Sequence, residues 1–166
     1  VHECPKPVIG RVNGAAFGGG IGLLAACDIT ITGPETKFAF SEVKLGIIPA
    51  VISSFVALRM TPADMRRLFI TGERFDAAVA HEVGLIDMIV PSDHLDITVE
   101  NCIEHVRSSG PSAISEVKHL IYNLLGMERH HFKQHTVEKI AALRVSAEGQ
   151  EGIGAFLEKR KPQWKR

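Results

Sequence analysis

A run of small residues, at positions 13–28, most constrains what this chain can fold into. A β-type segment, residues 7–12, leads into three consecutive glycines, Gly18-Gly19-Gly20, and an apolar segment typical of a buried helix follows. Glycines at a strand-to-helix junction let the backbone approach a bulky or anionic group, and the first helical turn leaves N–H groups unpaired. The junction therefore predicts either a site for a phosphate, carboxylate or developing oxyanion, or a crowded crossing that only glycine fits.

The composition fits a globular protein and argues against several function classes. The 166 residues suffice for one sizeable core, or for a core with a helical appendage. Lys+Arg and Asp+Glu both number 19, so no basic excess points to a nucleic-acid partner. No apolar stretch is long enough to span a membrane, and the first residues lack the pattern of a signal peptide. Cys4, Cys27 and Cys102 are an odd, widely spaced set that fits a reducing compartment, so we expect a cytoplasmic protein.

Strand and helix patterns alternate through residues 1–91. Strands are expected at residues 8–12, 28–32, 37–40 and 86–90, and helices after the glycines and at residues 50–60, 61–70 and 76–84. Thr61 is placed to cap the third of these helices, with Pro62 at its first position. The fourth is another capped helix, which begins at Asp76 and is closed by Gly84. Strands that alternate with helices favour parallel pairing through crossover connections, which predicts an α/β core.

Only helical patterns follow Pro91. Helices are expected at residues 93–108, 111–125, 133–148 and 151–161. We therefore expect residues 92–166 to form an all-helical C-terminal region.

Several motifs occur in a fixed order along nearly the whole chain. They are Pro5-Lys6-Pro7-Val8-Ile9, Asn13-Gly14, Gly18-Gly19-Gly20, Ala26-Cys27-Asp28-Ile29, and residues 38–49, 68–75, 83–86 and 155–162. In these motifs the chain resembles the enoyl-CoA hydratase/isomerase (crotonase) family. The resemblance implies a crotonase-like (ClpP/crotonase) spiral βαβ core, a helical C-terminal region that builds a homotrimer or hexamer, an acyl-CoA substrate, and no metal or redox cofactor.

The family usually carries a further N-terminal segment, and nothing in this sequence matches it. That segment supplies the first of two oxyanion-hole N–H groups and much of the site for the CoA adenine. We therefore expect either that an upstream part is absent from this chain or that the protein works without it.

Glu42 and Gly19 are the candidate catalytic residues. Glu42 is an ionisable group within a largely apolar stretch, where a carboxylic acid can exchange protons near neutral pH; taken alone, it also fits an exposed strand end. The resemblance implies that Glu42 transfers protons at the acyl chain. It also implies that the Gly19 N–H donates to the thioester oxygen, beside substrate-binding Gly18 and Gly20.

The basic end of the chain provides two further candidates for substrate binding. In the family, a Phe and a Lys of the terminal helix help to hold the CoA moiety, often from a neighbouring subunit, which points to Phe156 and Lys159. A solvated basic C-terminus, supported by the helix dipole, explains the same residues.

One position departs from the best-known hydratases of the family. They carry a second glutamate two residues past the glycine run, where this chain has Gly22. Three readings stay open: one carboxylate handles both protons, as in the isomerases; the substrate's own carboxylate, Glu73 or Asp76 replaces the missing acid; or the chain is a non-catalytic acyl-CoA-binding or oligomerisation partner. Residues 38–53 look most like hydratases of the methylglutaconyl type.

We therefore expect an enoyl-CoA hydratase of fatty-acid or branched-chain acyl-CoA breakdown, with an isomerase or a non-catalytic partner as alternatives. Two rival patterns are weaker. Gly20-Ile21-Gly22 with Ala25 and Glu42 matches the outline of a dinucleotide site, but the other motifs do not belong to that fold. His130, His131 and His135 suggest a metal, but no carboxylate signature surrounds them, and a solvated or inter-subunit face explains them better.

Overall fold

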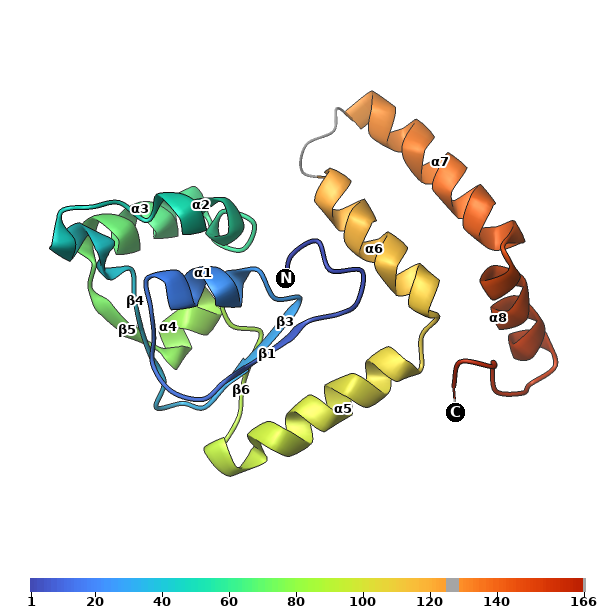
Figure 1. Ribbon diagram of the computed structural model, residues 1–166, viewed down its shortest axis with the longest axis horizontal. Helices are drawn as coiled ribbons and strands as arrows, with labels where there is room; N and C mark the ends of the chain where they lie inside the picture. Colours follow the sequence, from blue (N-terminus) through green and yellow to red (C-terminus); the bar gives the residue numbers. More distant parts are fainter. Residues whose placement is uncertain (125–128, 166) are drawn as a thin grey trace. The chain divides into compact units, whose positions relative to one another are not determined.

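The computed structural model describes residues 1–124 and 129–165, which fall into two compact units, Val1–Cys102 and Ile103–Arg166. The first unit carries the described strands (Figure 1). One sheet has the order β1-β3-β6, from β1 (Ile9–Val12), β3 (Ile29–Thr32) and β6 (Met88–Ile89). The other has the order β2-β4-β5, from β2 (Ala16–Phe17), β4 (Lys37–Ala39) and β5 (Arg74–Asp76).

The strand pairing confirms most of the expected α/β core. β1 pairs with β3, β3 with β6 and β2 with β4, all in parallel, as alternating strands and helices predict. β4 and β5 pair antiparallel, with Phe38 opposite Phe75, which the alternation does not predict. Neither β2 nor β5 is recognisable from the sequence, because segments of two and three residues are too short for a periodic pattern.

Six helices and one part of a seventh belong to this unit, in the described chain. They are α1 (Gly19–Ala25), η1 (Ser41–Leu45), α2 (Ala50–Val56), α3 (Pro62–Thr71), α4 (Ala77–Glu82), η2 (Ser92–His94) and the first half of α5 (Leu95–Arg107). Two begin at the caps expected from the sequence. The Asp64 N–H donates to Thr61 Oγ1 at 3.2 Å, and the Val79 N–H donates to Asp76 Oδ1 at 3.0 Å.

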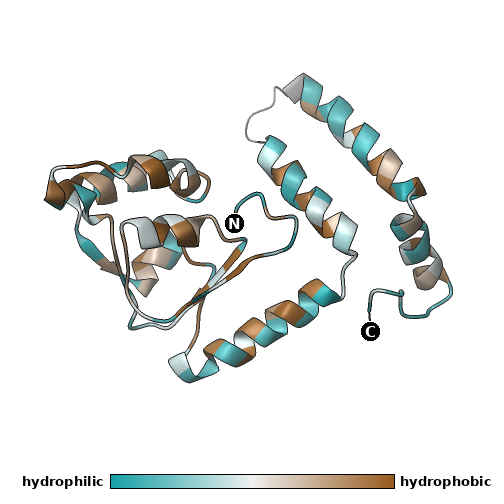
Figure 2. Ribbon diagram, in the orientation of Figure 1, coloured by the Kyte–Doolittle hydropathy of each residue, from teal (hydrophilic) through white to brown (hydrophobic). Residues whose placement is uncertain are grey.

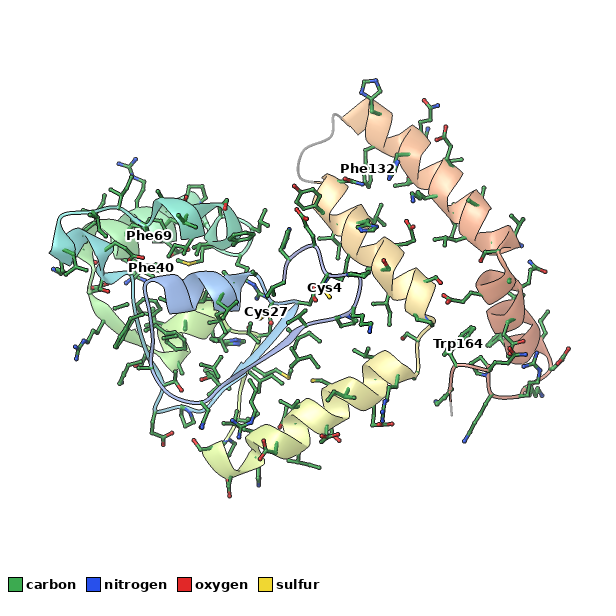
Figure 3. The ribbon with its side chains drawn as sticks, in the orientation of Figure 1. Cys4, Cys27, Phe40, Phe69, Phe132 and Trp164 are labelled. Carbon is green, nitrogen blue, oxygen red and sulfur yellow. The ribbon has the colours of Figure 1, made fainter. Side chains whose placement is uncertain are left out.

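Buried aromatic and aliphatic side chains join the helices to the strands. Phe38 and Phe40 are fully buried, and the Phe40 ring lies 4.5 Å from that of Phe69 on α3 (Figure 3). Ile21 of α1 and Val56 of α2 are also fully buried in this core. Each such side chain stabilises the fold by about 1.5–3 kcal/mol through burial alone. Packing of this kind holds α1 and α2 against each other and against β4.

In the second unit, helices are the regular elements among the described residues. It contains the end of α5, then α6 (Pro111–Leu124), α7 (Arg129–Val145) and α8 (Ala147–Leu157). Glu148 accepts hydrogen bonds from the backbone N–H groups of Ser112 and Ala113, at 2.9 and 2.8 Å. The indole N–H of Trp164 donates to the Ser108 carbonyl at 3.3 Å. Figure 2 shows most of α7 as hydrophilic, whereas hydrophobic residues are prominent in α2 and in the second half of α1.

The expected bounds of the last two helices, residues 133–148 and 151–161, are wrong, because α7 spans Arg129–Val145 and α8 spans Ala147–Leu157. The sequence pattern extends one helix to residue 148, but α7 ends at Val145 because the Ser146 side chain accepts the Gly149 N–H at 3.0 Å and starts α8. The expected end of α6 at residue 125 lies outside the described residues. Among the helices that are described, none combines the length and the hydropathy needed to cross a bilayer.

Candidate functional site

A cavity of about 560 Å³ opens in the first unit beside the glycine run. Helix α1 lines it with Gly19, Gly22 and Leu23, and the segment of residues 48–55 lines it with mostly apolar side chains. Glu42 of η1 is the one carboxylate among the described residues of this lining. The structure thus brings the two candidate catalytic residues, Glu42 and Gly19, to the same cavity.

Strand β4 positions both Glu42 and the start of α1, which carries Gly19. The Gly18 N–H donates to the carbonyl of Ala39, the last residue of β4, at 3.0 Å, and Glu42 follows Ala39 by three residues. A Cβ atom on Gly18 would lie 3.1 Å from Oε1 of Glu42, and Gly18 has a φ of +49°. Both the left-handed backbone and the close approach require glycine, so Gly18 lets the carboxylate reach the start of α1.

The short helix η1 fixes the backbone of Glu42 from both ends. The Glu42 carbonyl accepts the Ile47 N–H at 3.2 Å, and η1 ends at Gly46, whose φ is +73°. Gly72, at the end of α3, lies against η1 so closely that a Cβ there would be 2.9 Å from Val43 Cγ2. These contacts hold the carboxylate in place through its backbone.

The carboxylate itself is incompletely satisfied. Oε2 of Glu42 is buried and has no hydrogen-bond partner in the part of the chain that the structure describes. A buried carboxylate oxygen without a partner costs free energy, and such atoms cluster where a ligand or a proton is exchanged. Oε2 of Glu42 is therefore available to accept a hydrogen bond from a group in the cavity.

The start of α1 offers donors to the same cavity. The N–H groups of Ile21 and Gly22 donate to the Gly18 carbonyl, at 2.9 and 3.4 Å, whereas no hydrogen bond within residues 1–124 and 129–165 uses the N–H of Gly19 or Gly20. A Cβ on Gly19 would meet nothing within 4 Å, so its backbone borders open space. A free backbone donor at the positive end of a helix is suited to a developing oxyanion.

The side chain of Ile52 occupies the space beside Gly22. A Cβ atom on Gly22 would lie 2.2 Å from Cγ2 and 2.7 Å from Cβ of Ile52, which is 8% exposed on α2. No side chain fits at position 22 while Ile52 keeps its place. Among the described residues that line the cavity, Gly22 therefore leaves Glu42 as the one carboxylate.

The two replacement acids considered from the sequence are engaged elsewhere. Glu73 forms an ion pair with Arg67 at 2.9 Å, and Asp76 caps α4. Neither lines the cavity. Ile52 and its neighbours Val51 and Phe55 do line it, and sequence reasoning missed them, although their spacing on one helix face is typical of residues turned to one side.

The remaining candidates lie in the second unit. Phe156, on α8, is 82% exposed, and Lys159 follows the helix with a left-handed φ of 55°. Their part in substrate binding stays a prediction. The side chain of His130 lies outside the described residues, and no group of three metal-ligating side chains occurs among those described. Cys27 donates to the Leu23 carbonyl at 3.4 Å, which fits a packing role.

Comparisons with known proteins point to one family. The model of the family described as enoyl-CoA hydratase/isomerase matches residues 1–166. A carnitinyl-CoA dehydratase of Citrobacter koseri is 31% identical over 99% of this chain, which spans 65% of that relative's length. The chain thus covers less than two thirds of the curated relatives that it matches.

Solved structures show the same fold. An enoyl-CoA hydratase from Shewanella pealeana has a TM-score of 0.93 and 46% identity, over 98% of this chain and 61% of its own. AtuE of Pseudomonas aeruginosa has a TM-score of 0.95 and 33% identity, over 99% and 64%. The crotonase-like fold expected from the sequence is confirmed, and the chain belongs to the enoyl-CoA hydratase/isomerase family.

Proposed function

We propose that this chain carries the acid–base part of a site that adds water across the double bond of a 2-enoyl-CoA thioester. The observation that carries the proposal is the buried, unpartnered Oε2 of Glu42, at a cavity that Gly19 also lines. Two of the similar proteins are named as an enoyl-CoA hydratase and a carnitinyl-CoA dehydratase, and these names support the same reaction in its two directions.

One carboxylate suffices for both proton transfers. The Glu42 carboxylate accepts a proton from water as the water oxygen bonds to C3, and the electron pair of the double bond moves to the thioester oxygen. The Gly19 N–H stabilises this enolate oxygen; removal of one such donor from an oxyanion hole costs about 3–4 kcal/mol. The enolate then takes the proton back from Glu42 at C2, so that the carboxylate is regenerated.

The absence of a second carboxylate at position 22 also favours a second reaction, isomerisation. A single carboxylate can remove a proton from C2 of a 3-enoyl thioester and return it to C4, which shifts the double bond without water. The packing of Ile52 against Gly22 leaves Glu42 as the one carboxylate of the described lining, as this isomerisation requires. Product analysis separates the two reactions, because only hydration yields a 3-hydroxyacyl product.

The substrate and assembly proposals follow the family. Apolar residues that line the cavity, among them Leu23, Ile48 and Phe55, suit the acyl chain, and Phe156 and Lys159 are proposed to contact the CoA moiety. We propose a homotrimer or hexamer in the cytoplasm, without a metal or redox cofactor. A methylglutaconyl-type acyl-CoA is one of the substrates to be compared.

Replacement of Glu42 by glutamine tests the proposal. Glu42→Gln keeps the size of the side chain but cannot exchange the proton, so kcat for hydration should fall by about 10²–10⁴-fold. The affinity for a saturated acyl-CoA, measured by calorimetry, should stay within about threefold, because ground-state binding is unaffected. Straight-chain, branched and glutaconyl-type enoyl-CoA substrates are compared, with product analysis by mass spectrometry.

Glu73→Gln is the matched control, because Glu73 lies outside the cavity in an exposed ion pair. It should leave kcat unchanged. Equal loss of turnover and binding in Glu42→Gln, or no loss, would remove Glu42 from the mechanism. A wild-type chain that binds acyl-CoA without turning over any of these substrates would support the non-catalytic alternative instead.

A further inference from the structure

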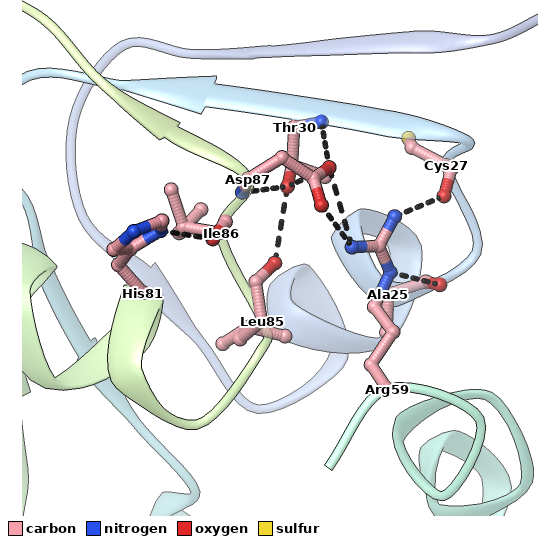
Figure 4. A network of polar contacts seen from close by, with 8 residues as sticks. All are labelled: Ala25, Cys27, Thr30, Arg59, His81, Leu85, Ile86 and Asp87. Atoms are coloured by element: carbon pink, nitrogen blue, oxygen red, sulfur yellow. Dashed lines mark hydrogen bonds and ion pairs between the residues drawn. The ribbon is translucent and has the colours of Figure 1, made fainter.

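A largely buried arginine grips the far end of the helix that carries Gly19. Arg59 follows α2, and its side chain is 13% exposed. Its Nε donates to the Ala25 carbonyl at 3.2 Å, and its Nη2 donates to the Cys27 carbonyl at 2.6 Å (Figure 4). Ala25 is the last residue of α1, so the guanidinium satisfies carbonyl groups that the end of a helix leaves unpaired.

The guanidinium is itself held by a carboxylate that the sheet fixes in place. Arg59 Nη1 lies 3.3 Å from Asp87 Oδ1, and Oδ2 of Asp87 accepts the Thr30 backbone N–H at 2.7 Å. The Thr30 hydroxyl, which is fully buried on β3, lies 2.9 Å from the same oxygen and accepts the Asp87 N–H at 3.0 Å. Asp87 therefore forms a rigid link between β3 and Arg59 (Figure 4).

The backbone of Arg59 is fixed as well. Gly84, with a φ of +83°, packs so closely that a Cβ there would lie 2.6 Å from the Arg59 carbonyl oxygen. Arg59 is thus held through its side chain by Asp87 and through its backbone by the turn after α4.

Helix α1 is consequently anchored at both ends. At its start, the Gly18 N–H is bonded to β4, and at its finish the carbonyls of Ala25 and Cys27 are bonded to Arg59. The helix has only seven residues and is about 10 Å long, so loss of the contacts at its last carbonyls is expected to tilt the whole element. Its tilt sets the direction of the Gly19 N–H relative to Glu42.

We propose that Arg59 is a positioning residue of this site: by tying the end of α1 to Asp87, it aims the Gly19 N–H at the thioester oxygen. The inference rests on the proposed function, in which that N–H stabilises the enolate. Arg59 does not line the cavity, so a substrate bound there is not expected to contact it.

Arg59→Lys tests this role, because lysine keeps the positive charge but cannot reach two carbonyls and a carboxylate with one fixed fork. Small displacements of a site by a distant substitution can cost about 10²-fold in rate. We expect kcat to fall by about 10–100-fold, with KM for the acyl-CoA within about threefold. Arg67→Lys is the matched control, because Arg67 is paired with Glu73 at the surface, and it should leave kcat unchanged.

A second measurement tests, without turnover, whether the Gly19 N–H donates to the thioester oxygen. The infrared carbonyl band of a bound thioester moves to lower frequency when an N–H donates to its oxygen, so the wild type should show this shift and Arg59→Lys should lose most of it. Guanidinium ions at low, non-denaturing concentration should restore part of the shift and of kcat in Arg59→Gly. A role limited to stability predicts that kcat and the carbonyl shift stay at wild-type values wherever the variant is folded.

The outcomes separate the two proposals. A wild type that shifts the carbonyl band without hydrating or isomerising any substrate contradicts the proposed function alone. A wild type without the shift overturns the positioning role, as does a folded Arg59→Lys variant with unchanged shift and kcat. Equal rises in KM and losses in kcat in that variant would also count against it, since aim affects the transition state more than binding.

Discussion

At the scale of single residues, packing and chemistry compete for the space beside Gly22. The Cγ2 atom of Ile52 stands where a side chain at position 22 would begin, 2.2 Å from an ideal Cβ. A carboxylate at position 22 therefore requires a smaller or displaced residue at position 52 of α2 as well as a substitution of Gly22. Whether position 22 can carry a side chain is therefore decided by a contact between two apolar helices.

Gly22→Ala should destabilise the protein although alanine favours helices over glycine. Overpacking of a core costs about 1–3 kcal/mol, which exceeds the gain of about 1 kcal/mol in helix propensity. Ile52→Ala alone should cost about 2–5 kcal/mol, and the double variant less than the sum, because the second substitution makes room for the first. Urea denaturation measures all three variants.

Gly20→Ala is the matched control on the same helix. A Cβ there would lie 3.9 Å from Ala16 Cβ, an ordinary contact, so this variant should be as stable as the wild type or more so. Equal stability of Gly22→Ala and Gly20→Ala would show that Ile52 can move aside at no cost.

At the scale of elements, the helical unit depends on a carboxylate that closes the start of α6. Burial raises the pKa of Glu148, but hydrogen bonds from the N–H groups of Ser112 and Ala113 lower it more, so the pKa lies below its ordinary value of 4.5. A carboxyl whose pKa is lower in the folded than in the unfolded chain stabilises the fold at every pH above its unfolded-state pKa. This stabilisation is lost as the pH falls through the pKa of the folded state.

Glu148→Gln should therefore lower the stability of the chain at pH 7 by about 1 kcal/mol, which is typical for loss of a helix N-terminal cap. The difference from wild type should shrink as the pH falls below 4.5, where the native carboxyl is protonated too. Urea denaturation followed by circular dichroism at several pH values measures this. Glu104→Gln, which affects an exposed pair with Arg107, should show neither effect.

The elements show what sequence reasoning can and cannot reach. Caps are local, so Thr61 and Asp76 reveal two helix starts, whereas Ser146 was overlooked because the apolar pattern runs past it. β5 exists only through its pairing with β4, which no local pattern encodes. In the site, resemblance points to Glu42 and Gly19, and the structure adds Ile52 and Arg59. Their contacts with Gly22, Ala25 and Cys27 join residues 30 or more positions apart.

At the scale of the whole molecule, exposed apolar side chains set the expectation for assembly. On α7, Val137 and Ile140 are 58% and 64% exposed, one helical turn apart. Neighbouring exposed apolar residues on a mostly hydrophilic helix are typical of an interaction surface. They fit the proposed homotrimer or hexamer.

Sedimentation velocity should therefore give the mass of three or six chains of 18.1 kDa. Replacement of both Val137 and Ile140 by aspartate should shift the protein toward monomer, because charges do not stay buried without partners. Lys133→Gln, an exposed change on the same helix, should not. A wild-type monomer, or a double variant with unchanged mass, would contradict this assembly surface.

The indole of Trp164 gives the helical unit an optical signal of its own. It is the single tryptophan of the sequence, with its N–H on the Ser108 carbonyl and its ring edge 3.0 Å from the place of a Cβ on Gly152. Fluorescence excited selectively at tryptophan therefore originates in the second unit alone. When denaturant melts the protein, the emission follows the helices while circular dichroism follows the entire chain. Coincident curves mean that the two units unfold together, and separated curves give each unit its own stability.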